Sequence, residues 1–142
     1  MASANFTALP LHLATAAINF STATFKCMLV TAVPSEANLD AWVNRADVVG
    51  EATGTGYTAG GVVVAVSVGA VDTANNRVAI NFADLAPGWT SATISAAAAL
   101  VYVSTGNAAT DKLVSMVDFG QTVSSTAGSY SVDFTTPLYI NG

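Results

Sequence analysis

Apolar and polar residues alternate at every second position along several stretches of the chain. In residues 77–83 the apolar positions are Val78, Ile80 and Phe82, and the residues between them are more polar. This period predicts β-strands with one face turned toward a core. The expected strands cover residues 24–31, 57–68, 77–83, 89–94, 97–103, 112–119 and 130–136, with a short final strand at 138–140.

One stretch has a helical period instead. Leu39, Trp42 and Val43 recur at i, i+3 and i+4, which places them on one helical face. Ser35 stands just ahead of them and is a residue type preferred at helix N-caps. We therefore predict a single clear helix at about 36–46.

The number and spacing of these elements indicate the fold class. Seven to eight short strands separated by turn residues predict an all-β jelly-roll or Greek-key β-sandwich with one short helix. The chain has 142 residues, which is enough for one domain. We expect this β-sandwich domain to cover 23–142, and residues 1–22 to form an N-terminal arm or a short helix.

Composition narrows the class of protein. Hydrophobic residues make up 52% of the chain and charged residues only 9%, which excludes a disordered chain. The net charge of −5 makes a nucleic-acid partner unexpected, because a phosphate backbone would be repelled. The least polar stretch, 59–71, is too short and too rich in Val and Gly to cross a membrane as a helix. No signal peptide is expected either, because residues 1–20 lack Lys and Arg.

Residues suited to catalysis or metal binding are scarce. His12 is the only histidine and Cys27 the only cysteine, so the chain cannot assemble a structural zinc site. We interpret His12 as a solvent-facing or docking residue and Cys27 as a small buried hydrophobe. Asp111, Asp118 and Asp133 could converge on Ca²⁺, but solubility explains them equally well. We predict no catalytic residue, no metal and no cofactor.

A glycine-rich stretch runs from Gly54 to Gly61 and contains Gly54, Gly56, Tyr57, Gly60 and Gly61. A phosphate-binding loop requires a strand before its glycines and a helix after them. Here the predicted helix comes first and a strand follows, so nucleotide binding is not expected. We interpret these residues as a structural motif, in which glycine permits positive φ or close approach of the backbone.

Several segments resemble a group of small structural proteins of tailed bacteriophages. The similar segments are 20–26, Trp42 in its helix, 51–61, 98–103, 112–114 and 117–120, so the resemblance covers about residues 12–135. Within that group the chain is most similar to capsid cement, or decoration, proteins with a jelly-roll fold. The resemblance implies a non-enzymatic virion protein that assembles in the host cytoplasm. It implies as partners the major capsid protein, on the capsid exterior, and further copies of the chain itself.

Two other functions stay open on the sequence alone. A phage tail or fibre protein, or a host-surface-binding module, would have the same fold and composition, and an enzyme is the least expected class. For a cement protein the candidate interface lies in the apolar terminal segments, which would pack on a second copy, most simply in a dimer, or on the major capsid protein. Packing of Leu138, Tyr139 and Ile140 on the domain's own sheet is the alternative. The candidate interface residues are Phe6, Leu9, Leu11, Leu138, Tyr139 and Ile140.

Overall fold

A computed structural model describes residues 2–142 and shows a mostly β protein. Strands hold 47% of the residues and helices 11%, and all strand pairs are antiparallel, so the predicted β class is confirmed. The strands are β1 (Ala2–Asn5), β2 (Phe25–Val30), β3 (Val62–Val64), β4 (Val66–Asp72), β5 (Arg77–Phe82), β6 (Leu85–Ala92), β7 (Ser95–Val103), β8 (Leu113–Ser124), β9 (Gly128–Val132) and β10 (Leu138–Asn141). The helices are α1 (Leu9–Ala14), α2 (Glu36–Ala41) and a 3-10 turn (Arg45–Asp47).

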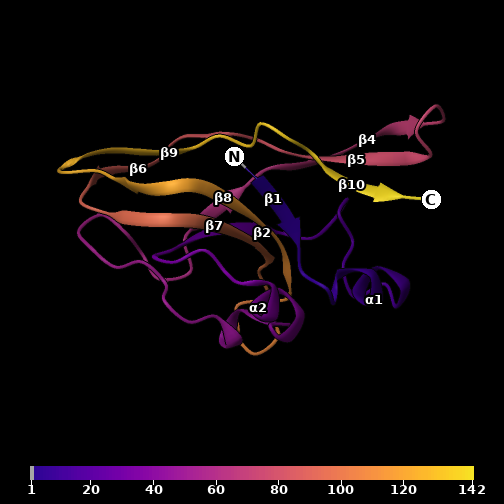
Figure 1. The fold of residues 1–142 in the computed structure, drawn as a ribbon, viewed down its shortest axis with the longest axis horizontal. Helices are drawn as coiled ribbons and strands as arrows, with labels where there is room; N and C mark the ends of the chain where they lie inside the picture. Colours follow the sequence, from indigo (N-terminus) through magenta and orange to yellow (C-terminus); the bar gives the residue numbers. More distant parts are fainter. Residues whose placement is uncertain (1) are drawn as a thin grey trace.

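The strands form three sheets. The largest has the order β1-β8-β7-β2-β3, the second has the order β10-β5-β4, and β6 pairs with β9. Only Ala65 separates β3 from β4, so residues 62–72 form the outer strand of the first sheet and then that of the second. Figure 1 shows β4, β5 and β10 extending together to one side of the molecule, with α1 on that same side.

The core occupies both faces of the five-stranded sheet. On β2, the alternation expected from the sequence is confirmed: Phe25, Cys27 and Leu29 join one buried cluster, whereas Met28 and Val30 join another. The first cluster connects the five-stranded sheet to the other two sheets through Ile80, Phe82, Trp89, Tyr130, Val132 and Leu138. The second lies beneath α2 and contains Phe6, Leu39, Leu100, Tyr102, Leu113 and Met116. A strand buried on both faces explains why β2 is almost wholly apolar.

The helix prediction was partly wrong. The helix expected at 36–46 ends at Ala41, because Trp42 has an extended backbone with φ −81° and ψ 126°. The Asp47 carboxylate accepts hydrogen bonds from the amides of Val43 and Asn44, which starts a separate 3-10 turn. The Ser35 cap is confirmed, since its side chain accepts a bond from the amide of Asn38. A second α-helix, α1, forms within the segment that the sequence left open between arm and helix.

Strand assignments also differ: within residues 2–142, ten strands replace the seven or eight expected, and the strand expected at 130–136 ends at Val132. The strand predicted at 57–68 begins only at Val62, because the glycine-rich residues before it form turns. Pro87 and Gly88, which fall between the strands expected at 77–83 and 89–94, lie inside β6, an edge strand with irregular register in which proline is tolerated. Most of the stretch between the strands expected at 112–119 and 130–136 is also strand, since β8 continues to Ser124 opposite Ser95 and β9 begins at Gly128.

Candidate functional site

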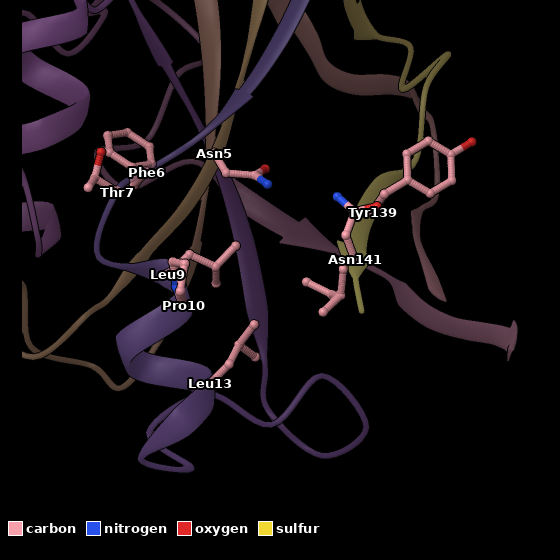
Figure 2. A pocket seen from close by; sticks show the side chains of 9 residues that line it. Asn5, Phe6, Thr7, Leu9, Pro10, Leu13, Tyr139 and Asn141 are labelled. Carbon is pink, nitrogen blue, oxygen red and sulfur yellow. The ribbon is translucent and has the colours of Figure 1, made fainter. Parts of the chain in front are cut away.

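A groove of the described chain lies between its two terminal segments. It has a volume of about 590 Å³ and is open to solvent. Its walls come from the turn after β1, from α1 and from β10, as Figure 2 shows. The lining residues are Asn5, Phe6, Thr7, Leu9, Pro10, Leu13, Tyr139, Ile140 and Asn141. None of these side chains carries a charge, so the groove suits an uncharged, largely apolar partner surface.

Strand pairing fixes the two walls. β1 runs antiparallel to β8, with Asn5 opposite Ser115, and β10 runs antiparallel to β5, with Ile140 opposite Val78. β1 and β10 are the outer strands of their sheets, so each has one edge without a neighbouring strand. Such an edge presents unpaired amide and carbonyl groups and is a site at which another chain can pair.

Local sequence features and one backbone hydrogen bond hold α1 next to that edge. Pro10 stands at the start of the helix, where its missing amide hydrogen costs nothing. Leu9 and Leu13 are four residues apart and therefore lie on one helical face. Leu9 is buried in the core and Leu13 packs partly against it. The amide of Phe6 donates to the carbonyl of Val114 at 3.1 Å, which ties the preceding turn to β8.

The six candidate interface residues are placed unequally. Phe6, Leu9 and Leu138 are buried within the chain's own core, whereas Tyr139 and Ile140 are half-buried and Leu11 is 62% exposed. β10 therefore packs on the domain's own sheet, which was the alternative for the last three residues. Four of the six, Phe6, Leu9, Tyr139 and Ile140, line the same groove although they come from opposite ends of the sequence.

A second, more open groove of about 530 Å³ shares Ile140 and Asn141 with the first. Val71, Val78 and Ile140 form its apolar surface and stand in one cross-strand row. Arg77 is the charged residue of this lining, and its guanidinium already interacts with two side chains of the same chain. Its guanidinium lies 3.7 Å from the centre of the Tyr139 ring, and its Nε lies 3.3 Å from Asp72 Oδ2.

The glycine-rich motif has a geometry that only glycine accommodates easily. Gly61 has φ +78°, and a Cβ there would stand 1.8 Å from the carbonyl oxygen of Cys27. Gly54 and Gly56 likewise lie against the backbone of residues 92–93, also with positive φ. The motif thus brings the chain against β2 and β6, and the lining of both grooves comes from other segments.

Two clusters of polar side chains form hydrogen bonds in and near the glycine-rich motif. The Tyr57 hydroxyl donates to Glu51 Oε1, which also accepts the amide of Gly60 at 2.6 Å. The Gly60 carbonyl in turn accepts the Tyr102 hydroxyl at 2.5 Å. Burial raises the pKa of Tyr57 far above its ordinary value, so its proton stays on the ring oxygen.

The second cluster centres on Asp111, which is 1% exposed. Arg45 Nε donates to Asp111 Oδ2 at 2.8 Å, and the Thr105 amide and hydroxyl donate to Oδ1. Burial alone would raise the pKa of Asp111, but these hydrogen bonds outweigh it and hold the pKa below its ordinary value. Asp111 therefore has a structural partner and is not a free carboxylate.

The residues considered for catalysis are unsuited to it in this structure. Cys27 is fully buried, and that burial raises the pKa of its thiol to about 12, so the reactive thiolate does not form near neutral pH. His12 is also buried, at 6% exposure. Within residues 2–142, His, Cys, Asp and Glu side chains form no group of three or more that could hold a metal ion. Over the same range, no helix has the length and apolarity needed to cross a membrane.

Sequence reasoning identified the groove only in part. It singled out apolar residues at both termini but had no means of showing that β1 and β10 face a common space. It missed α1 as a wall, Glu51 as an acceptor and Arg45–Asp111 as a buried pair. A comparison with protein-family models, curated proteins and solved structures finds no match to this chain.

Proposed function

We propose that this chain is a non-enzymatic virion structural protein, a decoration (cement) protein that binds the outer surface of a capsid shell. The observation that carries the proposal is the uncharged groove between α1 and β10, bordered by two strand edges without neighbours. A cement protein acts by burying surface across subunit boundaries, and low charge with exposed edges suits that task.

The partner of this groove is the major capsid protein, and symmetric copies of the chain cooperate on the shell. Many weak contacts then reinforce the capsid through multivalency without any chemical step. The chain's net charge of −5 suits the outside of a shell filled with DNA better than its inside. Assembly takes place in the host cytoplasm, where virions form.

The proposed fold is a jelly-roll or Greek-key β-sandwich. It is supported by the buried cluster that connects the five-stranded sheet with the three-stranded and two-stranded sheets. It is also supported by the passage from β3 to β4, where one segment leaves the first sheet and enters the second. Such corners are how strands switch between packed sheets.

The test is co-sedimentation of the purified chain with empty shells of the major capsid protein from the same virus. We expect saturable binding that Pro10→Glu weakens at least tenfold, because Pro10 is an exposed residue of the groove lining and the substitution places a charge in that uncharged surface. Val49→Glu is the matched control, since Val49 is 76% exposed and lines neither groove. Failure of the intact chain to bind shells, together with binding to a host-surface sugar, would replace the cement function with the host-binding one.

A further inference from the structure

The wall of the groove contains a buried histidine with an unsatisfied nitrogen. His12 lies in α1, is 6% exposed, and its Nδ1 has no hydrogen-bond partner among residues 2–142. Its backbone is well anchored, because its carbonyl accepts the amide of Ala17 at 2.8 Å and its own amide donates to Ala8. The imidazole is therefore held in place by the packing around it, without a bond to Nδ1.

The electrostatic surroundings disfavour a charged ring. The positive charge of Lys112, which comes just before β8, acts on His12 and disfavours its protonated form. Burial, and then the positive charge of Lys112, lower the pKa of His12 below its ordinary value. A proton added to this ring would thus create a buried cation in the field of the Lys112 charge, without an acceptor for its Nδ1 hydrogen.

The segment around His12 depends on that packing. α1 has six residues, and a helix of this length is not stable in water by itself. What holds it is the burial of Leu9 and Ile18 in the main core, together with His12 between them in the sequence. Leu9, Pro10 and Leu13 of the same segment form one wall of the groove.

We propose that residues 9–18 are an acid-sensitive latch, in which protonation of His12 releases α1 from the body of the protein and dismantles that wall of the groove. The latch is a property of the free chain. Its consequence for shell attachment, that acid loosens the protein from its partner, rests on the proposed function.

The direction of the pH dependence follows from the linkage between proton binding and docking of residues 9–18. The docked segment favours neutral His12, so the released state binds the proton more readily. The stability of docking is fully present above about pH 6.5, the ordinary value for histidine, and falls as the pH drops through 6.5 toward the lower pKa of the docked state. Each pH unit by which the pKa is lowered corresponds to about a tenfold loss in the docking equilibrium.

Two measurements on the intact, purified chain test the latch together. NMR titration of the His12 ring gives its pKa, and hydrogen exchange gives the protection of the His12, Thr15 and Ala17 amides, corrected for intrinsic exchange rates. We expect a pKa below 6.5 and a loss of protection in acid of about tenfold per unit of that difference. Amides of β7, such as those of Leu100 and Val101, keep their protection and serve as the internal control.

Two variants distinguish release caused by protonation of His12 from a general loss of stability in acid. His12→Gln cannot take up the proton, so its protection in residues 9–18 should not change between pH 7.5 and pH 5. Lys112→Gln keeps the histidine and removes the positive charge that lowers its pKa, so the pKa of His12 should rise toward 6.5 and the loss of protection in acid should be smaller than in the parent chain. A His12 pKa at or above 6.5 would overturn the proposal, as would acid release that persists in His12→Gln.

Shell binding is then measured separately. If free protein shows the latch, co-sedimentation at pH 5 should be weaker than at pH 7.5 for the intact chain and unchanged for His12→Gln. Release of α1 without any loss of shell binding would overturn the assignment of the groove as the shell contact and leave the latch itself standing. An intact chain that binds no shell at pH 7.5 would contradict the proposed function alone.

Discussion

The hydroxyl of Tyr57 lies 2.8 Å from Oε1 of Glu51 and donates a hydrogen bond to it. The same hydroxyl accepts the amide of Leu29 at 3.1 Å. β3 pairs with β2 only as far as Cys27, so beyond that point the Leu29 amide bonds to the side chain of Tyr57, while the Leu29 carbonyl accepts the amide of Ala52. One tyrosine thereby completes the edge of a sheet and anchors the loop that leads into β3.

Tyr57→Phe should lower the free energy of unfolding by about 2 kcal/mol, because the buried Leu29 amide loses its acceptor. Urea unfolding followed by circular dichroism measures this. Tyr139→Phe is the control and should change stability by less than about 0.5 kcal/mol, since that half-exposed ring contributes by stacking on Arg77. Equal effects in the two variants would contradict the role assigned to the Tyr57 hydroxyl.

Gly61→Ala should destabilise the protein by more than about 2 kcal/mol. Positive φ alone costs an alanine roughly 1–2 kcal/mol, and the new Cβ would also meet the Cys27 carbonyl. Gly106→Ala is the matched variant, because Gly106 has φ +88° with nothing within 4 Å of the added Cβ. The difference in thermal midpoint between the two variants isolates the backbone clash, and no difference would mean that the clash is relieved by movement of the loop.

Asp111→Asn should lower stability at pH 7 by about 2 kcal/mol, because it removes the charged acceptor shared by Arg45 and Thr105. The pKa of Asp111 is lowered by folding, so its contribution is present above about pH 3.9 and is lost as the pH falls through the folded-state value. The gap between parent and variant should therefore narrow below pH 4 in urea unfolding measured across pH. Asp72→Asn, at the exposed Arg77 pair, should leave stability nearly unchanged.

Cys27 should resist thiol reagents in the folded protein. Its pKa of about 12 and its complete burial leave no accessible thiolate at pH 8. Modification by a disulfide reagent should proceed only in denaturant, or at the slow rate of unfolding in its absence. Fast labelling of the native chain would show that β2 opens to solvent without global unfolding.

Local pattern was enough to predict the strands with a single buried face. At β5, Ile80 and Phe82 are buried and Asn81 is exposed, as alternation predicts. At β8 the exposed half, from Gly120 to Ser124, has the composition of a loop, yet it is a strand whose last two residues, Val123 and Ser124, pair with β7 beyond an irregularity in the register. That pairing is a tertiary effect, so no local signal in 120–124 indicates it.

The groove could not be predicted from the sequence for a related reason. Apolar residues at each end of the chain could be recognised, but their meeting depends on β1 pairing with β8 and β10 pairing with β5. Both pairings join segments about 60 residues or more apart, and hydrophobic pattern contains no information on which distant strands become neighbours. The buried Arg45–Asp111 pair was missed similarly, since 66 positions separate the two residues.

The pairing of the outer strands also sets an order of events during synthesis. β1 has no partner until β8, which begins at Leu113, has been made. β10 needs β5, which has by then been made. The groove between them thus forms only after synthesis has passed β10, at Leu138–Asn141. A chain interrupted before β10 would lack that wall, so it would not offer the whole surface to a partner.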